Sequence, residues 1–189
     1  MIVYSFVCGK VLADGNLVLV VDAAASERVC HVFDIASKNL TECKIADKRF
    51  PYAAGALVSG VPLICGGMDY YGPIRDCYAY DRVANRWNFV AGMRIERGSH
   101  AAVSISQRLW VSGGYIGSIT TARTEFVHLN GMVERGPDLP FATADHCMVT
   151  LHDGRVMVLG GQGNKRVVIF DPRSNTFTDV PTLECRGFL

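Results

Sequence analysis

Three Gly-Gly doublets at equal spacing constrain the fold of this sequence more than any other feature. Each doublet closes a short apolar run, and the runs are Leu63-Ile64-Cys65-Gly66-Gly67, Trp110-Val111-Ser112-Gly113-Gly114 and Met157-Val158-Leu159-Gly160-Gly161. The second glycines of successive doublets are 47 residues apart. A fixed period of this length indicates an array of supersecondary units, each of which buries its apolar face against its neighbours.

Other marks recur in step with the doublets. An aromatic residue followed by Asp stands at residues 33–34, 80–81 and 170–171. The third unit has Asn130-Gly131 at this place, and Asn-Gly favours a tight hairpin turn. The first unit has lost its doublet, since Val21 and Asp22 stand where the glycines would be. We therefore count four units, of which the first is degenerate.

Each unit contains four short apolar runs separated by Gly, Asn, Pro and Asp, the residues of turns. In the third unit these runs cover about 100–105, 109–112, 124–129 and 132–135. No segment has the 3.6-residue periodicity of an amphipathic helix. Four antiparallel strands in a repeated unit are typical of a propeller blade, so the sequence predicts an all-β fold of four such blades.

The second unit resembles a kelch repeat almost residue for residue. The matching stretches are Cys77-Tyr78-Ala79-Tyr80-Asp81, Asn85-Arg86-Trp87, Gly92-Met93 and Arg97-Gly98-Ser99-His100-Ala101-Ala102-Val103. The resemblance to the kelch β-propeller family extends over essentially the whole chain. Three further stretches resemble a group of secreted-looking invertebrate kelch proteins of unknown role: Thr124-Glu125-Phe126-Val127, Gly136-Pro137-Asp138-Leu139-Pro140 and His146-Cys147.

The predicted organisation is one kelch region over residues 1–189, with approximate repeats at 1–50, 51–95, 96–141 and 142–189. Glu184-Cys185-Arg186-Gly187 repeats the pattern of Glu96-Arg97-Gly98, which leads into a new innermost strand. The resemblance implies rings of more than four blades, so we expect an incomplete ring that self-associates through open blade faces. The alternative is a small closed ring, since four-bladed propellers exist.

Composition and motifs argue against several functions. The 19 Lys and Arg residues balance 18 Asp and Glu residues, and no basic run suggests a nucleic-acid partner. No apolar stretch reaches the roughly 20 residues of a membrane span. No nucleotide-binding, metalloprotease or hydrolase motif is present, and the five histidines are scattered. We expect no enzyme activity, no cofactor and no metal site, and we expect Asp34, Asp81 and Asp171 to support turns.

Binding residues are expected in the loops between the second and third strands of each unit, because these loops vary in length on a constant scaffold. Tyrosine and arginine are favoured anchors of interfaces. The candidate partner-binding residues from these loops, and from those leading into the innermost strands, are Tyr70, Tyr71, Arg75, Arg97, Tyr115, Arg123, Lys165 and Arg166.

The predicted function is a non-catalytic module that binds a protein or glycan through the loops on one propeller face. Two alternatives follow from the kelch resemblance. One is the substrate-recruiting part of an intracellular ubiquitin-ligase adaptor. The other is a copper-radical enzyme similar to galactose oxidase, which the adjacent Cys77 and Tyr78 do not favour because neighbouring strand residues face opposite sides.

The cysteines and one sequon bear on the compartment. Seven cysteines are present, so at least one is unpaired within the chain. A hairpin centred near Tyr71 would place Cys65 opposite Cys77, where the two thiols either form a disulfide or pack side by side. A disulfide would imply secretion. Together with a glycosylation sequon at Asn39, this favours an extracellular protein, with a cytoplasmic location as the alternative.

Overall fold

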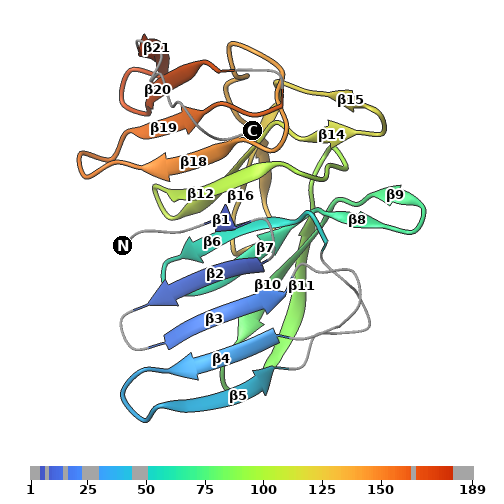
Figure 1. The fold of residues 1–189 in the computed structure, drawn as a ribbon, viewed down its shortest axis with the longest axis vertical. Helices are drawn as coiled ribbons and strands as arrows, with labels where there is room; N and C mark the ends of the chain where they lie inside the picture. Colours follow the sequence, from blue (N-terminus) through green and yellow to red (C-terminus); the bar gives the residue numbers. More distant parts are fainter. Residues whose placement is uncertain are drawn as a thin grey trace.

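The computed structural model describes the backbone of residues 5–6, 9–14, 17–22, 30–43, 51–162 and 165–180, and the side chains of 31–42, 51–162 and 165–180. Every regular element in these ranges is a β-strand. Four large antiparallel sheets follow one another along the chain, as the colours of Figure 1 show. The predicted all-β fold of antiparallel blades is therefore confirmed.

Within each large sheet, the strands lie in chain order. The first sheet contains β1 (Ser5–Phe6), β2 (Gly9–Asp14), β3 (Leu17–Asp22), β4 (Cys30–Asp34) and β5 (Asn39–Cys43). The second contains β6 (Ala54–Val58), β7 (Val61–Cys65), β10 (Asp76–Asp81) and β11 (Arg86–Gly92). The third contains β12 (Ala101–Ile105), β13 (Arg108–Ser112), β16 (Thr124–Val127) and β17 (Val133–Arg135). The fourth contains β18 (Cys147–Thr150), β19 (Val156–Leu159), β20 (Val167–Asp171) and β21 (Thr176–Val180).

Two features of this strand list differ from the sequence-based expectation. The first sheet has an additional short strand, β1, beside β2. Small hairpins also occupy segments that the sequence predicts to be loops. They are β8 (Met68–Asp69) with β9 (Gly72–Pro73), and β14 (Tyr115–Ile116) with β15 (Ile119–Thr120). Strands of two residues are too short for a periodic pattern to predict them.

The sheets are arranged as propeller blades. The first long strand of each sheet lies beside that of the next: β2 contacts β6, β6 contacts β12, and β12 contacts β18. Figure 1 shows these strands near the middle of the molecule, with the later strands of each sheet further out. They are therefore the innermost long strands of the blades.

The core lies between neighbouring blades. In β13, Leu109 and Val111 pack in a cluster with Leu63 of the second blade, whereas Trp110 points to the other face. The Trp110 ring lies 4.6 Å from the Phe170 ring of the fourth blade, measured between centroids. Because successive strand residues face opposite sides, a blade with a neighbour on each side needs an unbroken apolar run. Burial of each such side chain contributes about 1.5–3 kcal/mol.

The repeated aspartates close the turns between the third and fourth strands. Asp81 Oδ1 accepts hydrogen bonds from the backbone N–H groups of Val83 and Ala84, both at 3.0 Å. Asp34 makes the equivalent pair of bonds in the first blade. Asp171 Oδ1 accepts one from the N–H of Arg173 at 2.8 Å. The structure thus confirms that these residues support turns, as their recurrence once per unit predicted.

Candidate interaction surface

The Gly-Gly doublets lock each blade to the one that follows. Gly66 and Gly67 have φ angles of 63° and 109°, which a residue with a Cβ rarely adopts. The N–H of Gly67 donates to the carbonyl of Arg97 at 2.9 Å, across the boundary between the second and third blades. The N–H of Gly114 makes the equivalent bond to the Thr143 carbonyl at 2.8 Å. We call the end of the molecule formed by the doublets and the loops that follow them the doublet end.

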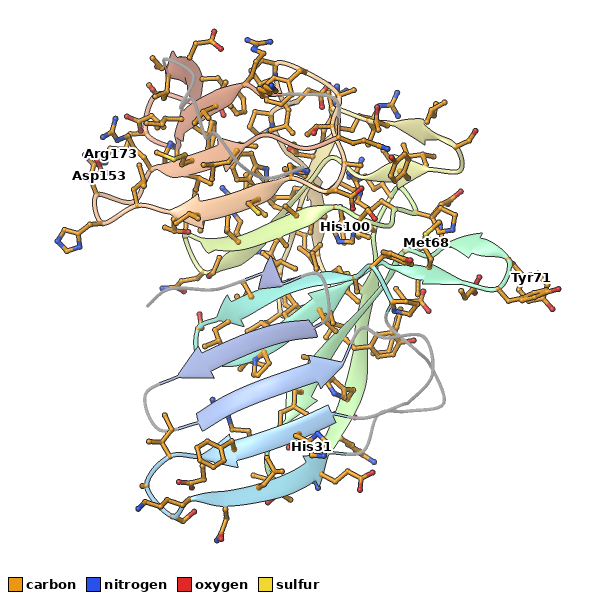
Figure 2. All side chains as sticks on the ribbon, in the orientation of Figure 1. His31, Met68, Tyr71, His100, Asp153 and Arg173 are labelled. Carbon is orange, nitrogen blue, oxygen red and sulfur yellow. A yellow bond between two sulfur atoms is a disulfide. The ribbon has the colours of Figure 1, made fainter. Side chains whose placement is uncertain are left out.

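Two tyrosines form the tip of the β8–β9 hairpin. Tyr70 is 96% exposed and Tyr71 is 93% exposed. Their rings meet edge to face, with centroids 5.4 Å apart. Asp69 fixes this tip, since its Oδ1 accepts hydrogen bonds from the N–H groups of Tyr71 at 2.8 Å and Gly72 at 3.1 Å. Figure 2 shows Tyr71 pointing away from the body of the molecule at the doublet end.

The corresponding hairpin of the third blade, β14–β15, presents different chemistry. Tyr115 lies at its base and is half-buried. Its backbone pairs with Gly98, donating at 2.8 Å and accepting at 3.2 Å. Ile119, at the other end of the hairpin, is 66% exposed. Tyr115 is therefore tied to the blade boundary. Gly117 and Ser118 stand at the tip that Tyr70 and Tyr71 occupy in the β8–β9 hairpin, and Ile119 follows them as an exposed apolar residue.

Four of the predicted binding residues are basic and lie just before the third strand of a blade, β10, β16 or β20. Arg75, Arg123, Lys165 and Arg166 are all exposed. Arg166 is held by Asp179, with Nη2 and Oδ1 2.7 Å apart, and its guanidinium lies 4.9 Å from the centre of the Phe141 ring. The structure thus leaves these side chains accessible at the doublet end, as a partner-binding role requires.

Arg97 is the exception among the predicted binding residues, and we correct this assignment. Its side chain has no exposed surface. Nη1 donates to the carbonyls of Gly113 and Arg123 at 2.7 and 2.8 Å, and Nη2 pairs with Glu125 Oε1 at 2.8 Å. Burial lowers the pKa of this guanidinium, and its bond to Glu125 opposes that shift. Arg97 therefore holds the third blade together and cannot reach a partner in this arrangement.

Three residues at the doublet end have a backbone conformation that was not predicted from the sequence. Tyr52, Ser99 and Asp145 have φ angles of 59°, 53° and 54°, in the left-handed region. The N–H of Ser99 donates to the Tyr52 carbonyl at 2.9 Å, and the N–H of Asp145 donates to the Ser99 carbonyl at 2.8 Å. Non-glycine residues in this conformation often occur at functional sites. Because their spacing follows the doublet period to within one residue, the repeat could have located them.

A disulfide lies beneath the β8–β9 hairpin. Cys65 is paired in register with Cys77 across β7 and β10, and their Cα atoms are 4.1 Å apart. The two are bonded and fully buried, so the disulfide is the alternative that the structure contains. The bridge closes the segment that carries Tyr70 and Tyr71. Such a disulfide is typical of oxidising compartments.

His146 is buried, with Nε2 2.8 Å from Ser112 Oγ, whereas the neighbouring Cys147 is exposed. Among the described residues, no group of three or more His, Cys, Asp and Glu side chains could hold a metal ion. The same part of the chain contains no helix of the length and apolarity needed to cross a membrane. Asn39 is exposed on β5, the outer strand of the first blade.

Comparison with solved structures defines the class of fold. The structure of YjhT, a kelch-repeat protein, matches with a TM-score of 0.80 at 13% sequence identity. The match covers 94% of this chain and 65% of the YjhT chain. The described blades therefore have the kelch-type β-propeller fold that the sequence resemblance predicted.

One curated relative is similar in sequence. Spermatocyte protein spe-26 of Caenorhabditis elegans, also a kelch protein, is 30% identical over 83 residues. Those residues are 43% of this chain and 14% of spe-26. No protein-family model matches the sequence.

Proposed function

We propose that this propeller is a non-catalytic interaction module that binds a protein partner through its doublet end. The observation that carries the proposal is the near-complete exposure of Tyr70 and Tyr71. Asp69 fixes the tip of their hairpin, and the Cys65–Cys77 bridge fixes its base. Binding is favoured when a partner removes these exposed aromatic rings from water. Tyrosine anchors also combine large contact area with a hydrogen-bonding hydroxyl. The Asp69 turn and the Cys65–Cys77 bridge limit the entropy lost when a partner orders this hairpin.

A photoreactive amino acid in place of Tyr71 tests the location of the interface in cells that make the protein. The matched position is Arg173, an exposed residue that lies at the other end of the molecule (Figure 2). We expect a covalent adduct with a defined protein from position 71 and none from position 173. The same protein should be captured at least tenfold less by the Tyr70→Ala/Tyr71→Ala variant, since interface anchors contribute about 2 kcal/mol or more.

Two outcomes would contradict the proposal. Equal adducts from positions 71 and 173 would show that the partner does not bind preferentially at the doublet end. Undiminished capture by the double variant, at an unchanged melting temperature, would show that the tyrosines are not anchors. A glycan partner would give no protein adduct from either position.

We further propose that the protein works in an extracellular or other oxidising compartment. The buried Cys65–Cys77 bridge and the exposed Asn39 sequon both support this proposal. Protein taken from its native source should carry the bridge, and Asn39→Gln should remove an endoglycosidase-sensitive mass. Free thiols at both cysteines in that material would instead favour the intracellular adaptor function.

A further inference from the structure

A hollow of about 280 Å³ opens beside the linker that joins β11 to β12. Its walls come from this linker and from the third blade, at the start of β16 and the end of β17. The lining residues are Arg94, Ile95, Arg123, Thr124, Glu125 and Arg135. Three of these six side chains are guanidinium groups, and all three are exposed. This concentration of cations contrasts with a chain that is nearly neutral as a whole.

The only carboxylate in the lining is already neutralised. Glu125 is 2% exposed, and its Oε1 pairs with Arg97 Nη2 at 2.8 Å. Oε1 also accepts from the N–H of Ile95 at 3.2 Å, and Oε2 accepts from the N–H of Arg94 at 2.6 Å. Both oxygens of Glu125 are therefore committed to the structure beneath the hollow. They do not offset the charges on its walls.

The charges of two wall arginines remain unbalanced. Arg135 has a partner, since its Nη2 lies 2.7 Å from Asp138 Oδ2. Arg94 donates from Nη2 to the Val133 carbonyl at 3.3 Å, a neutral acceptor that positions the guanidinium without cancelling its charge. The structure records no carboxylate partner for Arg94 or Arg123 among the residues it describes.

We propose that this hollow binds a tetrahedral oxyanion, a sulfate or phosphate group. Two unbalanced guanidinium groups match the charge of a dianion. Each presents a planar fork of N–H donors, so two forks can be filled by the oxygens of one tetrahedral group. A carboxylate offers two oxygens and one charge, which suffices for one fork. A sulfate or phosphate group is small enough to enter a hollow of this volume.

This inference goes beyond the proposed function. The hollow shares Arg123 with the doublet end, but it includes neither of the tyrosines that carry the proposed interface. Its test needs no partner protein. A failure of the tyrosine interface would leave the oxyanion site standing, and the reverse also holds.

Titration of the full chain with sodium sulfate and with sodium phosphate tests the site, with sodium chloride holding the ionic strength constant. Chemical-shift changes of arginine side-chain and nearby backbone N–H groups report binding. We expect saturable binding of at least one of these anions, and weaker binding of sodium acetate. A preference for sulfate would identify a sulfate ester as the natural group, and a preference for phosphate would identify a phosphate ester.

The matched variants are Arg94→Gln/Arg123→Gln in the hollow and Arg173→Gln at the other end of the molecule. The double variant should lower the affinity by at least about tenfold, since it removes the charge-assisted hydrogen bonds that the two guanidinium groups donate to the anion. Arg173→Gln should leave the affinity unchanged, and melting temperatures control for folding. Absence of saturable binding, equal binding of acetate, or equal losses in both variants would overturn the proposal.

Discussion

The imidazole of His100 lies where a side chain on Gly66 would stand. A Cβ atom built on Gly66 would be 2.6 Å from the Arg97 carbonyl oxygen and 2.7 Å from His100 Cε1, both much closer than atoms in contact. The relationship repeats in the next pair of blades, where a Cβ on Gly113 would be 2.7 Å from His146 Cε1. Both histidines are buried. The first glycine of a doublet is therefore required by the ring of the following blade as well as by its own backbone conformation.

Gly66→Ala should consequently destabilise the protein by about 2–5 kcal/mol. The left-handed φ of 63° costs roughly 1–2 kcal/mol for a residue with a Cβ. Displacing His100 adds about 1–3 kcal/mol of overpacking. Urea denaturation followed by tryptophan fluorescence measures the change, since Trp110 lies in the core.

Gly92→Ala is the matched control for this substitution. A Cβ there would meet only the Arg75 side chain, at 3.5 Å or more, which is ordinary contact with a flexible group. We expect a change within about 0.5 kcal/mol. Equal losses from the two alanine variants would mean that the histidine contact is not what the doublet preserves.

Loss of the Cys65–Cys77 bridge should lower the free energy of unfolding by about 3 kcal/mol, the loop-closure value for a short segment. The bridge spans 12 residues, and both sulfurs are buried. Cys65→Ser/Cys77→Ser should therefore melt at a lower temperature. Native protein should be reduced slowly, because access to the sulfurs requires local opening.

The exposed Cys147 provides the control for the cysteine variant. It forms no disulfide with a described residue, so Cys147→Ser should leave the melting temperature unchanged. Rapid reduction of native protein without loss of stability would contradict the structural role of the bridge.

Much of the fold could be predicted because the informative residues act locally. The doublets mark strand ends by backbone conformation, and the pairing of Cys65 with Cys77 follows from counting outward from a hairpin centre. The burial of Arg97 could not be predicted from its position in a loop. A charged loop side chain is buried only where the fold supplies an oppositely charged partner. That partner, Glu125, did give a signal. It shares a strand face with the buried Val127, and a carboxylate on such a face needs a cation.

Substitutions in the Arg97–Glu125 pair should show strong coupling. Glu125→Ala leaves the guanidinium of Arg97 buried with two carbonyl partners and no anion, which should cost about 3–5 kcal/mol. Arg97→Leu should be similarly destabilising, because it leaves the carboxylate uncompensated. The variant with both substitutions should lose much less than the sum of the two single losses. Additive losses in this double-mutant cycle would show that the pair is not the interaction that holds these residues.

The turn aspartates should make stability depend on pH in the acid range. Backbone N–H groups, of Ser37 for Asp34 and of Ala84 for Asp81, hold the pKa of each carboxyl below its ordinary value. A carboxyl whose folded-state pKa is depressed contributes stability above its unfolded pKa of about 3.9, and this contribution is lost as pH falls through the lower folded value. Asp81→Asn retains an oxygen acceptor but no titrating group. Its melting temperature should therefore fall less than that of the wild type as the pH is lowered from 5 through the unfolded-state pKa and below it. Parallel acid curves for the two proteins would contradict the role assigned to the Asp81 carboxylate.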